Sequence, residues 1–286
     1  MNKKTIFIIL TLLSFILGSG ALGYLYYYTN PTRSKHPDLS DSKYFIAHAT
    51  GSIFGYVYVN SKESLIKSIE NGYQLIEVDL DKTSDGVLVC VHDWEDFNKA
   101  SIPNICWRDS CQFLKIPTLK EFKQRKIYGL FTPLTLREVI ELQQEYHFTL
   151  VTDRISNPTI LNDYFNQGNR KDVMVEAFSE EDYHRLKADG YIPMLSVQLI
   201  TDYFDCLKFI VTHLINNDIE WIVVDYHSRL RFLRLLKKLF GIKIAAYTIN
   251  SPSYLFEHLE NDFDLVYTDN WNLKTQLNNF QNHTTH

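Results

Sequence analysis

Glu77 and Asp79 stand two residues apart in an otherwise apolar stretch that runs from Leu75 to Leu80. In a β-strand, residues two apart point to the same face, with Cα atoms roughly 6.5 Å apart. Two carboxylates at that spacing can share one hard cation, whereas burying both without a counter-ion is costly. The alternative is a half-exposed hairpin in which both carboxylates face water, because Ser84-Asp85-Gly86 is typical of a turn.

Two histidines each end an apolar stretch. His92 ends the stretch that begins at Val87, and His48 ends the one that begins at Tyr44. Because neutral and protonated imidazole are both accessible near pH 7, histidines beside a metal can act as general acid and base. Either histidine alone is more simply interpreted as a strand-end residue bonded to a carbonyl. Both together, beside several carboxylates, favour catalysis.

The elements that must position these residues alternate regularly along the chain. We expect strands at 44–48, 73–80, 149–153, 173–177, 192–197, 221–225, 242–248 and 265–268. We expect helices at 61–71, 135–146, 158–166, 179–188, 201–216, 228–240, 251–260 and 271–280. Eight strand-then-helix steps in about 240 residues predict the α/β class and a (β/α)₈ TIM barrel.

An insertion is expected after the second strand. Residues 87–92 would pair with that strand as a hairpin, and residues 94–133 would form a loop-rich segment. This segment holds Cys106 and Cys111, which could pair if the domain is exported. Farther along the chain, Thr135 is a plausible N-cap, with a glutamate at the capping-box spacing three residues later.

Polar residues lie at the expected carboxyl ends of the strands, where a TIM barrel has its active site. Asp153 ends the strand that should neighbour the one carrying Glu77 and Asp79, so three carboxylates are expected to meet at one divalent cation. Ligation by oxygen alone suits Ca²⁺ or Mg²⁺ better than zinc or copper. The other residues expected at these ends are His48, Asp225, Thr248 and Asn250.

Residues 1–28 are expected to form an N-terminal transmembrane helix. No charged side chain occurs between Lys4 and Arg33, and this apolar stretch is long enough to cross a bilayer. A cleaved signal peptide is the competing interpretation, because Ser19-Gly20-Ala21 could serve as a cleavage site. Either interpretation places the folded domain outside the cytoplasm, anchored in one case and secreted or periplasmic in the other.

Residues 29–42, rich in proline and polar side chains, are expected to be a linker, and residues 43–286 the barrel. The net charge of −5 and the isoelectric point near 6.1 argue against a general nucleic-acid binder.

One alternative concerns the expected helix 228–240, whose Arg231, Arg234 and either Lys237 or Lys238 lie on one face. Such a stripe could rest on anionic lipid, but the outer face of a barrel helix is more often simply solvated.

The central part of the chain contains, in order, His48, Asn60-Ser61, Glu77-x-Asp79, Thr83-x-Asp85-Gly86 and His92-Asp93. This order resembles the glycerophosphodiester phosphodiesterases, members of the phospholipase-C-like phosphodiesterase barrel superfamily. Fainter similarity continues through residues 133–136, 177–179, 247–250 and 268–269, so that the resemblance spans about residues 44–271.

The resemblance implies metal-assisted hydrolysis of a phosphodiester. His48 and His92 would be the acid and base, and Glu77, Asp79 and Asp153 would hold one Ca²⁺ or Mg²⁺. In this family a neighbouring glycerol hydroxyl is thought to attack phosphorus first, after which water opens the cyclic phosphate. Contacts to the substrate are implied for Asn60, Arg154, Tyr247 and Asn250. The implied partners are a phosphodiester small molecule or lipid headgroup, and the membrane through the N-terminal helix.

Two positions depart from the family pattern. The family usually has His-Arg-Gly after the first strand, whereas this chain has His48-Ala49-Thr50-Gly51. It usually has a lysine two residues after the third-strand carboxylate, where this chain has Ile155. Arg154 is the nearest cation, but in a strand it would point away from the face of Asp153. These departures motivate an alternative function, a catalytically degenerate barrel that binds a phosphorylated glycan or lipid without cleaving it.

Overall fold

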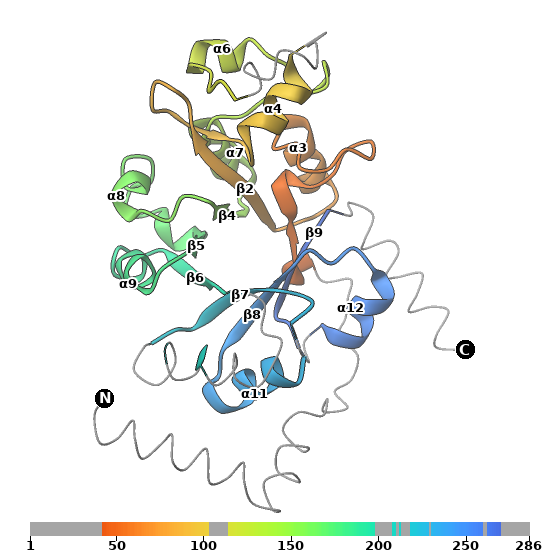
Figure 1. Ribbon diagram of the computed structural model, residues 1–286, viewed down its shortest axis with the longest axis vertical. Coiled ribbons are helices and arrows are strands. Elements are labelled where there is room, and N and C mark those ends of the chain that lie inside the picture. The colour runs from red at the N-terminus through yellow and green to blue at the C-terminus, as the bar shows by residue number, and fades with distance from the viewer. Residues whose placement is uncertain are drawn as a thin grey trace, which may run out of the picture.

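Eight parallel strands form a closed barrel in the computed structural model, which describes residues 42–102, 114–197, 208–209, 212, 218–228, 230–259 and 262–269 (Figure 1). The strands are β1 (Phe45–Ala47), β2 (Leu75–Lys82), β4 (Thr149–Asp153), β5 (Val173–Ala177), β6 (Ile192–Ser196), β7 (Trp221–Asp225), β8 (Lys243–Tyr247) and β9 (Leu265–Thr268). Neighbours around the ring follow chain order, and β1 pairs with both β2 and β9, which closes the barrel. The predicted barrel of eight parallel strands is confirmed, and it is consistent with a TIM barrel.

The strand β3 (Leu88–Cys90) pairs antiparallel with the far end of β2, as the hairpin prediction required. The segment after it is less irregular than the sequence indicated, because it contains helices α4 (Trp94–Ser101) and α6 (Leu119–Lys123). Asp93 and Thr118 cap them, since each side chain accepts a hydrogen bond from a backbone N–H of the first turn. Phe97 and Phe122 stack at 5.0 Å between these helices and give the insertion a core of its own.

The remaining described helices are α3 (Lys62–Glu70), α7 (Leu136–Tyr146), α8 (Pro158–Leu161), α9 (Glu180–Ala188), α11 (Leu230–Phe240) and α12 (Pro252–His258), and they surround the strands (Figure 1). Short 3₁₀ turns lie at Ser42–Tyr44, His48–Thr50 and Arg170–Asp172. The capping box expected at Thr135 is present, with Glu138 returning a bond to the cap backbone. It fixes where α7 begins, directly after the insertion.

Alternate residues of each strand pack in two different hydrophobic cores. Ile76, Val78 and Leu80 of β2 pack in the outer core between strands and helices. The opposite face of β2 begins with Leu75, which packs inside the barrel among residues such as Val151 and Met174. Farther along this inner face stand Glu77 and Asp79, each only 1% exposed. The interior is therefore apolar at its base and acidic toward the carboxyl ends of the strands, and the alternative of a water-facing hairpin is wrong.

Several predictions fall outside the described residues. They are the N-terminal segment 1–28, the linker 29–41, the pair Cys106 and Cys111, the helix 271–280 and most of the helix 201–216. Within the part of the chain that the structure describes, no helix has the length and apolar character needed to span a bilayer. On α11, Arg234 and Lys237 bind the carboxylates of Asp262 and Asp264, so these two cations of the basic stripe are engaged within the fold.

Candidate active site

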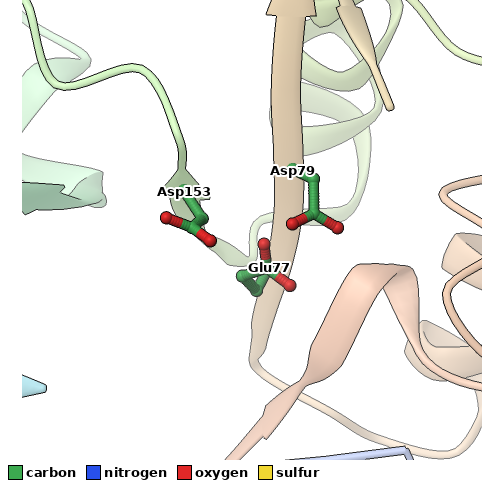
Figure 2. A group of neighbouring side chains, drawn as sticks. All are labelled: Glu77, Asp79 and Asp153. Atoms are coloured by element: carbon green, nitrogen blue, oxygen red, sulfur yellow. The ribbon is translucent and has the colours of Figure 1, made fainter. Parts of the chain in front are cut away.

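Three carboxylates meet at the carboxyl ends of β2 and β4. The parallel register pairs Asp79 with Asp153, and Glu77 lies two residues earlier on the same inner face of β2. Each residue offers one oxygen, and these oxygens all lie within 4.8 Å of one another. Figure 2 shows Asp79 and Asp153 on either side of Glu77, with the three side chains pointing toward a common space. The three predicted metal ligands are thus brought together.

Backbone and amide groups hold two of these carboxylates from behind. Asn60 Nδ2 donates to Asp79 Oδ2 at 2.8 Å, and its Oδ1 accepts from the Asp79 backbone N–H at 3.2 Å. The backbone N–H of Ala49 donates to Glu77 Oε2 at 2.5 Å. Asn60 is 2% exposed and lies outside the residues that line the cavity described below. In this structure its contacts orient a carboxylate, and its contact with substrate stays a prediction.

The turn after β1 brings Ala49 into this position through an unusual backbone. Ala49 and Thr50 have φ of 47° and 68°, in the left-handed region that β-carbons disfavour, and Gly51 follows with φ of 83°. A β-carbon on Gly51 would lie 2.2 Å from Ser68 Oγ, so this position accepts only glycine without a shift of its neighbours.

The three clustered carboxylates are too buried and too close together to be ionised at once without a compensating positive charge. Burial, with repulsion from Asp79 and Asp153, raises the pKa of Glu77 well above its ordinary value. Burial and the charge of Asp79 likewise raise the pKa of Asp153. Glu77 Oε1 is buried and has no hydrogen-bond partner among the described residues. An oxygen-only donor set with an unsatisfied buried oxygen fits a hard divalent cation such as Ca²⁺ or Mg²⁺.

A chain of hydrogen bonds from residues that follow β8 and β9 orients His48. Its Nδ1 is 2.8 Å from Asp269 Oδ1, just beyond β9. Asn250 Nδ2 donates to the second oxygen of Asp269 at 2.9 Å, and Asn250 Oδ1 accepts from Thr268 Oγ1 at the same distance. Burial acts to raise the pKa of Asp269, but the contact with His48 and the bond from Asn250 lower it overall. Asn250 thus orients Asp269, and its expected contact with substrate stays a prediction.

His92 reaches the same space from the hairpin. The backbone N–H of Val91 donates to the Asp79 carbonyl at 2.9 Å, which fixes the hairpin end beside the carboxylates. Tyr58 contacts both histidines, with its ring centroid 4.6 Å from that of His48 and 5.5 Å from that of His92. Both predicted acid–base residues therefore face one site.

These groups line a cavity of about 280 Å³, called here the central cavity. Its lining comprises His48, Tyr58, Glu77, Asp79, His92, Asp153, Glu176, Phe178, Ser196, Tyr247, Thr248 and Tyr267. Tyr247 is present as expected. Arg154 is exposed and is not part of the lining, and among the described residues no lysine or arginine is.

Neither Glu176, which lines the cavity, nor Asp269, which contacts His48, was predicted as a site residue. Glu176, 6% exposed, accepts a hydrogen bond of 2.6 Å from the Tyr267 hydroxyl, and burial with the charge of Asp153 raises its pKa to about 8. The spacing along β5 could have predicted that Glu176 faces the barrel interior, because it lies two residues after Met174, which packs in the inner core. Asp269 belongs to the stretch 268–269 of the family resemblance. Its hydrogen bond to His48 forms only because β9 pairs with β1 and closes the barrel.

The comparisons with known proteins agree with this geometry. Residues 53–189, which include the three clustered carboxylates and His92, match the model of the Glycerophosphoryl diester phosphodiesterase family. A search of curated proteins finds no match.

Similar solved structures share the fold. A phosphodiesterase from Oleispira antarctica, solved in complex with its product sn-glycerol-3-phosphate, has a TM-score of 0.61 and 19% identity, covering 84% of this chain and 96% of that one. A glycerophosphodiester phosphodiesterase from Agrobacterium tumefaciens has a TM-score of 0.59 and 16% identity, over 81% and 97%. One from Thermotoga maritima has a TM-score of 0.52 and 21% identity, over 76% and 91%.

The family match leads to one assignment, and these structures share the fold. Residues 53–189 belong to the glycerophosphoryl diester phosphodiesterase family of hydrolases.

Proposed function

We propose that this protein hydrolyses glycerophosphodiesters, or lipid and polymer headgroups with the same linkage, with the help of one divalent cation. The observation that supports this most directly is the placement of two histidines and three clustered carboxylates around one cavity. A cation held by Glu77, Asp79 and Asp153 would neutralise the phosphate oxygens and lower the pKa of the attacking hydroxyl.

His48 is the better candidate for the general base. Its Nδ1 contacts Asp269, which leaves Nε2 as the nitrogen available to substrate and stabilises the imidazolium that forms when a proton is accepted. We assign it removal of the proton from the glycerol hydroxyl that attacks phosphorus. His92, whose ring contacts the same Tyr58, then protonates the departing alcohol oxygen. In the second step the two roles reverse, because water opens the cyclic phosphate along the same path.

The test uses the purified full-length chain. Hydrolysis of glycerophosphocholine and of a chromogenic phosphodiester is measured with calcium, with magnesium and with a chelator. We expect metal-dependent turnover that His48→Ala and His92→Ala each reduce by about 10³-fold, while circular dichroism shows an unchanged fold. Full activity in either variant contradicts the assigned roles. Tight metal-dependent binding of these phosphodiesters without turnover would support the degenerate barrel instead.

The proposal extends to location. The apolar stretch 5–28 supports a membrane-anchored protein whose barrel lies outside the cytoplasm. Intact-mass measurement of the protein purified from membranes should find residues 1–28 retained. A mature chain that begins near residue 22 would instead identify a cleaved signal peptide.

A further inference from the structure

Two tight turns concentrate exposed apolar side chains on one part of the surface. The first turn runs from Ile53 to Tyr56, and the second from Ile127 to Phe131. Eleven large apolar side chains are exposed in the described part of the chain, and six of them lie on or directly after these turns: Phe54, Tyr56, Val57, Tyr58, Tyr128 and Leu130. These six are called here the apolar tip. Clustered apolar exposure marks an interaction surface, whereas single exposed residues are ordinary.

The two turns form one preformed surface. The ring of Tyr56 lies 4.6 Å from that of Tyr128 and 5.5 Å from that of Phe131. Residues of both turns also border one hollow of about 440 Å³. Ile53 and Phe131 are buried in the core of the insertion, which fixes the base of each turn.

The backbone of the first turn makes an aromatic side chain at its end unfavourable. Phe54 and Gly55 have φ of 50° and 83°, and a two-residue turn of this kind favours asparagine or glycine at its first position. Phe54 instead places a β-carbon in the left-handed region, and at 83% exposure it gains little packing within the fold. Tyr128 repeats the pattern in the second turn, with φ of 53°. A partner that covers these rings would account for them, because the packing of the chain itself does not.

The composition of the apolar tip indicates the kind of partner. Neither residues 54–58 nor residues 128–130 include an acidic or basic side chain, so the tip offers no charge to a nucleic acid or an acidic peptide. Three of its six side chains are tyrosines, whose ring and hydroxyl suit the boundary between hydrocarbon and water. The tip therefore fits the surface of a lipid bilayer, including one made of zwitterionic lipid alone.

The chain that precedes the barrel is long enough to bring the apolar tip to a membrane. The stretch 5–28 is the predicted anchor, and thirteen residues, 29–41, separate it from Ser42, where the described part begins. Thirteen residues span at most about 45 Å. Phe54 lies twelve residues after Ser42, so these two residues are at most about 43 Å apart. A membrane that holds residues 5–28 is thus within reach of the tip.

We propose that the apolar tip inserts into the interfacial layer of a lipid bilayer and docks the barrel there. Tyr58 belongs to the tip and also lines the central cavity, so docking would place one edge of that cavity at the lipid surface. The proposal concerns a contact between the fold and lipid, and it does not depend on phosphodiesterase activity.

The experiment places one additional tryptophan in the full-length protein. Phe54→Trp, Leu130→Trp and Leu239→Trp are each reconstituted in phosphatidylcholine vesicles with brominated acyl chains, which quench tryptophan only at short range. Wild-type emission in the same vesicles is subtracted, because the chain has four tryptophans of its own. If residues 1–28 prove to be cleaved, the mature chain is mixed with the same vesicles and the readout is unchanged.

The two reporters in the apolar tip should differ from the third. We expect the added emission of Phe54→Trp and Leu130→Trp to fall by about twofold or more on bromination. The emission of Leu239→Trp should not change, because Leu239 is an exposed apolar residue on α11, outside the tip. Since the tip has no charge, we expect the same quenching with added anionic lipid and at high salt.

A second substitution tests whether Phe54 drives the insertion. Phe54→Asn removes the ring and supplies a residue that the turn favours, so the fold should be kept. Combined with Leu130→Trp, it should lower the ratio of inserted to free tips by about 10-fold, because burial of the phenyl ring is lost. Leu239→Gln is the matched control and should leave this ratio unchanged. Equal effects of the two substitutions contradict the proposal.

The other outcomes distinguish the alternatives. Absence of quenching at both tip reporters overturns the proposal. Quenching that requires anionic lipid and appears equally in Leu239→Trp identifies the basic stripe of α11 as the membrane contact and also overturns it. Blue-shifted emission of Phe54→Trp that grows with protein concentration without lipid identifies a second copy of the chain as the occupant, with the same consequence. Since no measurement requires turnover, failure of the docking proposal and failure of the proposed phosphodiesterase function are separate results.

Discussion

His48 and Asp269 are 221 residues apart in the sequence and are joined by a hydrogen bond of 2.8 Å between Nδ1 and Oδ1. The contact exists because β9 pairs with β1 and closes the barrel, with Ala47 directly opposite Thr268. The ends of the first and last strands thereby place a carboxylate behind a candidate general base. A carboxylate in this place fixes the orientation of the imidazole and stabilises its protonated form.

Replacement of Asp269 should therefore reduce catalysis without reducing metal binding. We expect Asp269→Asn to lower kcat by about 10²-fold with little change in KM. Calorimetric titration with calcium or magnesium should give the wild-type Kd, because Asp269 is not one of the clustered carboxylates. Asn250→Ala, which removes one bond to Asp269, should cause a smaller loss. An equal fall in kcat and in metal affinity would contradict a positioning role.

Asn60 should control metal affinity instead. Its side chain makes two hydrogen bonds to Asp79, one to the carboxylate and one to the backbone. We expect Asn60→Ala to weaken metal binding by about 10- to 100-fold, as loss of a group that orients a ligand commonly does. Raised metal concentration should restore much of the activity. Asn250→Ala serves as the control for this titration, and unchanged metal affinity in Asn60→Ala would refute the argument.

Stability of the metal-free protein should fall as the pH rises from about 4.5 to about 8. Burial raises the pKa of Glu176 to about 8 from an ordinary value of 4.5 and raises that of Glu77 in the same direction. In this range the folded protein keeps protons that the unfolded chain has lost, so raising the pH favours unfolding. Urea denaturation in chelator at several pH values measures the slope.

Two additions test the cause of that slope. Glu176→Gln removes one titrating group and should make the dependence on pH shallower. Added metal should stabilise the protein most at the high end of the range, where the carboxylates have lost their protons. A slope that neither change affects would show that other groups are responsible.

Gly51→Ala should be unusually destabilising for so small a change. The new methyl group would sit 2.2 Å from Ser68 Oγ at a φ of 83°, in the turn that carries His48 and Ala49. We expect a loss of more than about 2 kcal/mol in the free energy of unfolding, together with lower activity.

Gly86→Ala isolates the backbone contribution to this loss. Gly86 has φ of 84°, but an added β-carbon there meets nothing within 4 Å. It should lose only about 1 kcal/mol from the strain of the left-handed backbone. Equal losses in the two variants would show that the contact with Ser68 is unimportant.

Much of the fold could be predicted from the sequence, because apolar stretches and helix caps recur at regular positions along the chain. Alternating apolar stretches and capped helices predicted the strands of the barrel and its closure. The helices α4 and α6 were missed, since their caps, Asp93 and Thr118, lie in a segment whose polar composition resembles a loop. The period of two along β2 similarly predicted that Glu77 and Asp79 share a face, because that spacing is a property of every strand.

The sequence by itself thus determined the barrel, the three clustered carboxylates and the two histidines that follow their strands. Only the tertiary structure decided which polar residues support others: Asn60 holds Asp79, Asn250 holds Asp269, and Arg154 lies outside the cavity. It alone placed Glu176 beside Tyr267. The physical reason is that such contacts depend on the register and closure of the ring, which bring together residues that no local spacing relates.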